Sequence, residues 1–145
     1  MSIGIIGGSD GPTAIYLSSS IKFEAVLFLI IISLLLVHEM DAIRAKEWRL
    51  FIVLKDIAEE TAYRIFTSIH LLLYFVILYF LICGGAITNY VTKLIIDIFL
   101  LVHAILHYCF RNKENNGFHY RYSKIIIYAM ALLSLIHLLI MLLWN

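Results

Sequence analysis

Long apolar runs separated by short polar segments dominate the chain. The runs that can cross a bilayer cover residues 23–38, 61–83, 90–110 and 123–144. A spanning helix needs about 20 predominantly apolar residues, so the first run is long enough only if its flanking positions lie at the interfaces. The pattern predicts an all-α integral membrane protein that folds as a four-helix antiparallel bundle.

The composition supports this class of protein. Hydrophobic residues make up 63% of the 145 positions and charged residues 14%, and the mean hydropathy is +0.96. Soluble domains lie nearer about 45–50% apolar and about 25% charged. The net charge of +1 gives no indication of a nucleic-acid partner. We expect contact with the lipid bilayer, while a homo-oligomer or a membrane-protein partner stays open.

The basic residues predict how the chain is oriented. Lysine and arginine concentrate around the loops that follow the first and third spans, whereas the other side carries only Lys22 and Lys93. Cytoplasmic loops have this excess, so we expect a multi-pass protein of the cell membrane with both termini extracytoplasmic. Cys83 and Cys109 end the second and third spans. They then lie at opposite faces, too far apart for a disulfide.

Residues 1–20 differ from the four-span domain at 21–145. The segment from Ser2 to Tyr16 reads SIGIIGGSDGPTAIY, which is rich in glycine and contains the only proline. The string closely resembles a motif of the sodium-translocating carboxylic-acid decarboxylase β subunits, G-I-I-G-G-[AS]-D-G-P-T-[AS]-I-[YF].

This resemblance implies non-helical backbone at membrane depth and an aspartate that helps bind sodium, which here is Asp10. It covers about the first 20 residues, and the other segments of those much larger proteins have no counterpart in the sequence. Irregular backbone in lipid must be enclosed by protein, and four helices enclose little. Three interpretations therefore stay open: an ion-binding loop, a recognition peptide and a flexible tail.

Ionisable side chains follow directly on the first apolar run. His38 and Asp41 are three residues apart, which places them on one face of a helix. An alternative is a solvated charge ladder of Asp41, Arg44 and Glu47 at the end of a helix. If the first span has its flanking positions, such as His38, at the interfaces, we expect Trp48 and Phe51 at headgroup depth as aromatic anchors.

Further histidines fall at similar depth under the predicted topology. His103 and His107 are four residues apart in the third span, and His70 lies two to three turns into the second span. Imidazole and carboxylate ligands suit transition metals, and zinc is the first expectation. The sequence thus predicts a metal site on the cytoplasmic side with candidate ligands His38, Asp41, His70, His103 and His107.

Other roles remain open for these residues. Membrane helices also use His, Ser, Thr and Tyr as interhelical hydrogen-bonding groups, and a proton or ion relay is a third possibility. Asp97 does not share the face of His103 and His107, and we expect it to bond a tyrosine or a water. His137 lies three residues after Ser134 and His119 lies in a polar loop, and neither is a candidate ligand.

Two functions are compatible with this pattern. If the metal site is catalytic, we expect a metal-assisted hydrolase of a lipid-like substrate, with Glu39 or Asp41 as the base beside a metal-bound water. The alternative is a non-catalytic ion-handling or accessory protein that is related through its N-terminal motif to the sodium-pumping decarboxylases. In that case sodium would be the ion and Asp10 its ligand.

The segment from His38 to Phe51 carries a second resemblance. It contains H-E-M-D-A, then four residues, then E-W-R-L-F, and it is similar to a group of small bacterial four-span proteins with H-E-[IM]-D-A-x(4)-E-W-x-x-F and no assigned activity. It also faintly resembles membrane proteins with an H-x-x-E-E motif, although Asp41 and Ala42 stand where the two acids would be. This fainter resemblance implies a histidine–acid site in the first span and nothing about a substrate.

Overall fold

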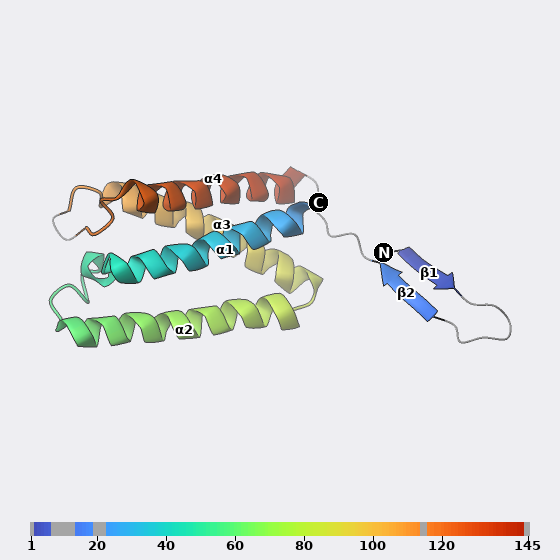
Figure 1. Ribbon diagram of the computed structural model, residues 1–145, viewed down its shortest axis with the longest axis horizontal. Coiled ribbons are helices and arrows are strands. Elements are labelled where there is room, and N and C mark those ends of the chain that lie inside the picture. Colours follow the sequence, from blue (N-terminus) through green and yellow to red (C-terminus); the bar gives the residue numbers. More distant parts are fainter. Residues whose placement is uncertain (1, 7–13, 19–22, 114–115, 144–145) are drawn as a thin grey trace.

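The computed structural model describes residues 2–6, 14–18, 23–113 and 116–143. Four long helices form an antiparallel bundle: α1 (Phe23–Arg44), α2 (Glu59–Cys83), α3 (Ala86–Cys109) and α4 (Arg121–Leu143) (Figure 1). All four are long and apolar enough to cross a membrane. The predicted all-α four-helix bundle is therefore confirmed.

The two ends of the bundle differ in how the helices are joined. At one end, called here the connector end, residues 45–58 join α1 to α2 and residues 110–120 join α3 to α4. At the other, called the terminal end, α1 begins, α4 ends and the Gly84–Gly85 pair joins α2 to α3. A side chain on Gly84 would clash, because its Cβ would come within 2.2 Å of the Phe80 carbonyl oxygen.

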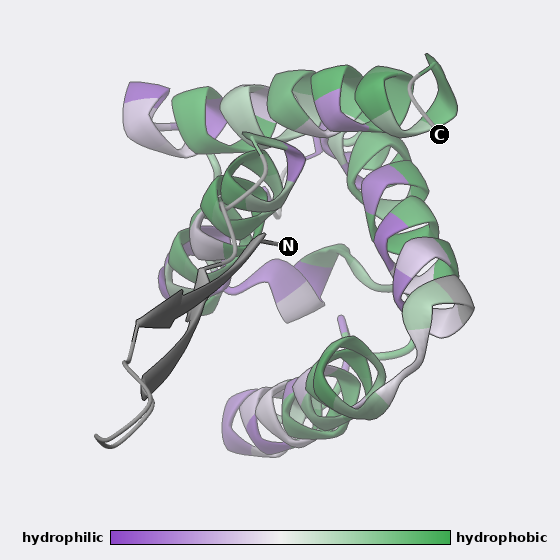
Figure 2. Cartoon of the chain, turned by 90° about the vertical axis from the view of Figure 1, so that its right-hand side faces the viewer, coloured by the Kyte–Doolittle hydropathy of each residue, from purple (hydrophilic) through white to green (hydrophobic). Residues whose placement is uncertain are grey.

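The helices are packed unequally. α4 packs along both α1 and α3, whereas α2 packs on α3 and on the short helix η1 (Glu47–Leu50). Figures 1 and 2 show α4 on one side of the α1–α3 pair and α2 on the opposite side. Within α2 only Ala62 and Phe66 are buried. α2 is thus the helix with the least interior contact and the largest exposed apolar surface.

The segment after α1 folds back onto the bundle. α1 continues past the predicted apolar limit to Arg44, and Lys46 then adopts a left-handed conformation at φ 54°. Such a φ is uncommon for a residue with a side chain. The turn leads into η1, and Trp48 is buried with 3% of its surface exposed. Trp48 packs against Phe66 at 5.5 Å between ring centroids, so the expectation of an anchor at headgroup depth is wrong for this residue.

Two apolar clusters fill the interior. One lies at the connector end and contains Trp48, Leu50, Phe66 and Phe118, together with Ala42 and Ala104. The other fills the middle of the α1–α3–α4 group and consists of Leu27, Phe28, Ile31, Leu35, Ile96, Leu100 and Met130. We call this second cluster the apolar layer, since it separates the polar groups described below.

The described residues of the N-terminal segment, 2–6 and 14–18, are strands rather than helix. Strands β1 (Ser2–Ile6) and β2 (Ala14–Ser18) pair antiparallel, with Ser2 opposite Ser18 and Ile6 opposite Ala14. Residues 7–13 lie outside the described residues, and Asp10 is among them. The sodium prediction for Asp10 therefore stays a prediction.

Candidate metal centre

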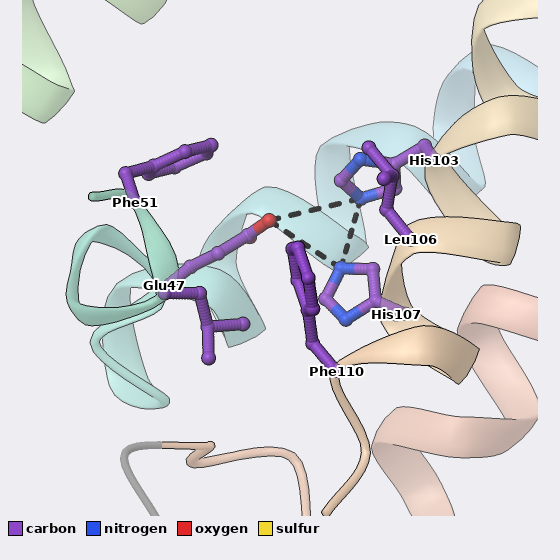
Figure 3. Close-up of a pocket in the computed structure, with 7 residues that line it drawn as sticks. Glu47, Phe51, His103, Leu106, His107 and Phe110 are labelled. Atoms are coloured by element: carbon purple, nitrogen blue, oxygen red, sulfur yellow. Dashed lines mark hydrogen bonds and ion pairs between the residues drawn. The ribbon is translucent and has the colours of Figure 1, made fainter. Parts of the chain in front are cut away.

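Four side chains from three elements converge at the connector end. They are His38 of α1, Glu47 of η1, and His103 and His107 of α3, and one ligand atom from each lies within 4.8 Å of all the others. We call them the connector-end group. Figure 3 shows the Glu47 carboxylate facing the rings of His103 and His107 across a small cavity. This cavity has a volume of about 40 Å³.

The Nε2 atoms of the three histidines point at one another. His103 Nε2 lies 2.8 Å from His38 Nε2 and 3.0 Å from His107 Nε2. The Glu47 carboxylate completes the set, with one oxygen 3.3 Å from His107 Nε2 and 3.9 Å from His103 Nε2 and the other 3.7 Å from His38 Nε2.

These distances fit a four-coordinate metal. Zinc lies about 2.0–2.2 Å from nitrogen and oxygen ligands, which places tetrahedral ligand atoms about 3.4 Å apart. The measured separations lie on both sides of this value. Three neutral imidazoles and one carboxylate are also a donor set that zinc and similar divalent ions accept. One feature fits less well, because His38 Nδ1 is buried and has no hydrogen-bond partner among the described residues.

The end of α1 brings Glu47 to the histidines. On an uninterrupted helix Glu47 would follow His38 by nine residues, or about two and a half turns, and would lie on the opposite face. The left-handed Lys46 breaks the helix and η1 turns the carboxylate inward. Glu47 is consequently only 6% exposed. The alternative interpretation, a solvated charge ladder of Asp41, Arg44 and Glu47, is therefore wrong for Glu47, whose side chain is buried.

The loop between α3 and α4 covers the group. Phe118 is buried and its ring centroid lies 4.5 Å from that of His107 and 5.7 Å from that of His38. Gly117 allows this contact, since a Cβ there would come within 2.1 Å of the Ala45 carbonyl oxygen. Asn116 shapes the turn by accepting the Phe118 N–H at 2.9 Å. The polar loop predicted from the sequence thus contributes an apolar cover.

The setting of Glu47 keeps its carboxylate ionised. Burial by itself raises the pKa of this carboxyl, but the hydrogen bond with His107 and the nearby rings of His103 and His38 more than offset it. The pKa of Glu47 is therefore lowered from its ordinary value. An ionised carboxylate is the form that binds a metal.

The structure brings together three of the five residues predicted as ligands, namely His38, His103 and His107. His70 lies beside the group and pairs with Glu39 instead, at 3.1 Å between His70 Nε2 and Glu39 Oε2. His70 Nδ1 lies 2.7 Å from the Phe66 carbonyl oxygen. Because a carbonyl only accepts, Nδ1 donates this hydrogen bond, and Nε2 is the ring nitrogen that faces Glu39.

Asp41 does not join the group. Its carboxylate accepts the Arg44 Nε–H at 2.8 Å, and the same guanidinium donates to Ser123 Oγ of α4 at 3.2 Å. One turn after His38, the chain thus directs Asp41 toward α4 rather than toward α3. The prediction that Asp41 shares a pocket with the histidines is corrected, and Glu47 occupies the place expected for it.

A larger cavity of about 430 Å³ adjoins the connector-end group. It lies between α2 and α3, and its lining includes Glu39, Glu47, His70 and His103 at one end and apolar side chains over the rest. The connector-end group is therefore adjacent to an apolar space, and the Glu39–His70 pair lies at the same end of that space.

A second polar group lies near the terminal end. His137 of α4 contacts Asp97 of α3 through Nδ1 at 2.6 Å and Glu24 of α1 through Nε2 at 3.1 Å. Lys93 Nζ donates to the same Glu24 oxygen at 2.9 Å. We call Glu24, Lys93, Asp97 and His137 the terminal-end group. Asp97 thus bonds a histidine rather than the expected tyrosine or water.

These features define a class: small membrane proteins with four apolar helices and a buried histidine–carboxylate group at one end of the bundle. The chain belongs to a family of unknown function, DUF6713, whose model matches residues 24–143. The match covers all four helices and both polar groups. No curated protein and no solved structure matches the chain.

Proposed function

We propose that this protein is a membrane metalloprotein that binds one divalent transition metal ion, with zinc the first expectation, through the connector-end group. We further propose that it is a metal-assisted hydrolase of a lipid-like substrate. The observation that carries the proposal is the convergence of His38, Glu47, His103 and His107 on one buried point.

Hydrogen bonding alone does not satisfy this arrangement. A ring nitrogen offers either one proton or one lone pair. His103 Nε2 has two close nitrogen neighbours, at 2.8 and 3.0 Å, and it can make a good hydrogen bond to only one of them. A shared cation accepts all three lone pairs at once, which favours a metal over interhelical hydrogen bonds as the role of these residues.

The Glu39–His70 pair supports a hydrolytic role. A bound metal lowers the pKa of a water ligand to about 7. Glu39 and His70 lie 3.1 Å apart and line the same cavity as Glu47 and His103, so the Glu39 carboxylate is placed to take up a proton from water and return it to a leaving group. Of the two bases predicted from the sequence, we assign this role to Glu39, because Arg44 and Ser123 hold Asp41 elsewhere.

The alternative of an ion-handling or accessory protein is less well supported. Passage of an ion through the bundle requires polar groups between the two ends. Between the connector-end and terminal-end groups lies the apolar layer, which includes Ile31, Leu100 and Met130. The buried Ser134, between Met130 and His137 on α4, adds one neutral hydroxyl there and no charged group. This alternative therefore relies on the N-terminal resemblance and on Asp10.

Metal analysis of purified protein tests the proposal. We expect about one equivalent of zinc after reconstitution, lost in His107→Ala and in Glu47→Gln. His119→Ala is the matched control, since His119 is an exposed histidine outside the group, and it should retain the metal. A wild-type protein that fails to bind added Zn²⁺, Fe²⁺, Mn²⁺ or Ni²⁺ stoichiometrically overturns the proposal.

We also propose that the connector end faces the cytoplasm, as the basic residues indicate. The free cysteines provide the test, because Cys83 and Cys109 are both exposed and end α2 and α3 at opposite ends of the bundle. A membrane-impermeant maleimide applied to intact cells stripped of their wall should label Cys83 and leave Cys109 unmodified until the membrane is opened. The reverse pattern contradicts the orientation, and single Cys→Ser variants assign each signal.

A further inference from the structure

The cavity between α2 and α3 is polar at one end and apolar along the rest of its length. Glu39, Glu47, His70 and His103 line the connector end. Beyond them the lining is almost entirely hydrocarbon, with residues such as Leu73, Ile77, Phe80, Ile95, Ile96 and Phe99. A ligand that satisfies both parts has a polar group at one end and a hydrocarbon chain at the other.

The cavity is long and parallel to the helices. Its lining on α2 extends from Phe66 to Phe80, a distance of about 21 Å at 1.5 Å per residue. On α3 the lining from Thr92 to Leu106 also covers about 21 Å. One leaflet of the hydrocarbon core is about 15 Å thick, half of the about 30 Å of a bilayer. The cavity is therefore long enough to hold a lipid tail in one leaflet together with the polar group at its end.

The cavity opens toward the bilayer. Several lining residues also have large exposed fractions, among them Val76 at 40%, Phe80 at 41% and Ile95 at 61%. A side chain that both lines a cavity and lies on the surface marks its opening. Because these residues lie on the sides of membrane-spanning helices, the opening faces lipid and a chain can enter without leaving the membrane.

One more polar atom lies along this path. Tyr74 lines the cavity one turn beyond His70, and its hydroxyl is buried with no hydrogen-bond partner among the described residues. A buried hydroxyl without a partner destabilises the folded protein. A bound ligand with a carbonyl oxygen near the polar end of the cavity would satisfy it.

We propose that this cavity binds the single hydrocarbon chain of a fatty acyl ester or amide, with its carbonyl at the polar end beside His103 and Glu47. The hydrolysis of that bond rests on the proposed function, whereas the binding of the chain does not. In the reaction, the oxygen of water forms a new bond to the carbonyl carbon and the bond to the ester oxygen or amide nitrogen breaks. Glu39 takes the proton of the water and the leaving group receives it, which gives a fatty acid and an alcohol or amine.

Photo-crosslinking in phosphatidylcholine nanodiscs tests the binding of the chain. The probe is a palmitoyl ester with a diazirine in the middle of its chain, used with both zinc-loaded and metal-free protein. We expect saturable labelling at lining residues such as Leu73, Ile77 and Phe99, with competition by unlabelled palmitoyl ester and not by the two-chain phosphatidylcholine. Leu139 of α4, which is 47% exposed, reports ordinary lipid contact.

Matched tryptophan variants sharpen the test. Val76→Trp fills the middle of the cavity and should lower the saturable labelling by at least fivefold. Leu72→Trp is the control, since Leu72 is 64% exposed on the same helix and is not part of the lining. Thr92→Trp at the far end should weaken binding of a palmitoyl chain and leave an octanoyl chain unaffected. Denaturant titration in detergent serves as the check that each variant is folded.

The outcomes separate the two proposals. Saturable labelling in a protein that binds no metal means that the chain site stands and the metalloenzyme proposal fails. A metal-replete protein labelled equally at Leu139 and Ile77, or a Val76→Trp variant labelled like the wild type, overturns the chain site alone.

Discussion

The two polar groups of this bundle contain similar residues and differ in how donors and acceptors are matched. Each includes histidine and glutamate, and each ties α1 to α3. At the terminal end the ring nitrogens of His137 each face a carboxylate, at 2.6 and 3.1 Å. At the connector end the nitrogens of His38, His103 and His107 face one another.

The difference decides which group needs a further cation. In the terminal-end group each ring nitrogen of His137 faces a carboxylate oxygen, of Asp97 or of Glu24, and Lys93 donates to the same Glu24 oxygen. Donors and acceptors are therefore matched within the protein. The connector-end group has one carboxylate and three ring nitrogens, so it lacks both the charge and the donors to satisfy itself. Residue type alone does not distinguish a structural network from a candidate metal site. The way in which donors and acceptors face one another distinguishes them.

The largest effect that we expect is on zinc affinity. His103→Ala should weaken zinc binding by more than about 100-fold, because even the loss of a partner outside the ligand shell typically costs about 10–100-fold. His137→Ala removes a buried histidine from the terminal-end group and should leave the affinity unchanged. Calorimetric or chelator-competition titrations measure both. Equal losses in the two variants would show that the groups are coupled and that our comparison is wrong.

The second prediction reverses the comparison and concerns stability without metal. Asp97→Ala leaves a fully buried His137 and should lower the free energy of unfolding by about 3–5 kcal/mol, the cost of breaking a buried ion pair. Zinc affinity should not change. The control is Glu60→Gln, because the Glu60–Arg64 pair is exposed, with side-chain accessibilities of 69% and 74%, and surface pairs contribute about 0–1 kcal/mol. Denaturant titration in detergent measures each, and a loss under about 1 kcal/mol for Asp97→Ala contradicts the structural role.

The sequence revealed the helices and the histidine spacings more readily than the acidic ligand. The apolar runs predict the helices directly, and the four-residue interval between His103 and His107 places both side chains on one face of a helix. Glu47, rather than the predicted Asp41, faces the histidines because α1 ends between them. Neither glycine nor proline marks that end in the sequence, since Lys46 adopts the left-handed conformation. Only the E-W of the second resemblance associates Glu47 with His38.

The sequence also did not reveal that Phe118 covers the connector-end group. The sequence around Asn116 and Gly117 indicates a turn, but a turn signal does not reveal which neighbouring side chain is buried. Phe118 packs on His107 because Gly117 lets the loop approach the backbone of Ala45. Such a contact between distant segments depends on how the loop packs against α3 and the end of α1. The local sequence pattern carries no information about that packing.

The third prediction concerns pH and is smaller. Saturating zinc, at about 100 times its dissociation constant, should raise the free energy of unfolding by about 2.7 kcal/mol. Protons compete for the same histidine nitrogens, so this gain should be present at neutral pH and decrease as the pH is lowered. Glu47 remains ionised through this range because its pKa is lowered.

Thermal unfolding with and without zinc, at several values of pH, measures this gain. His137→Ala should show the same pH dependence of the zinc effect, since His137 belongs to the terminal-end group. A zinc effect that persists unchanged at pH 5 would indicate ligands other than histidine.

The smallest effect that we expect is that of sodium, and it concerns the terminal end. A working sodium site at Asp10 would raise thermal stability with increasing sodium, since a ligand of the native state stabilises it by mass action. We expect no difference between sodium and potassium at equal ionic strength, and no change in Asp10→Asn. The resemblance to the decarboxylases is confined to about 20 residues, and Glu24, the nearest acid after that segment in the sequence, is already engaged by Lys93 and His137. A sodium-specific rise in melting temperature that Asp10→Asn abolishes would contradict this expectation and would restore the ion-handling alternative.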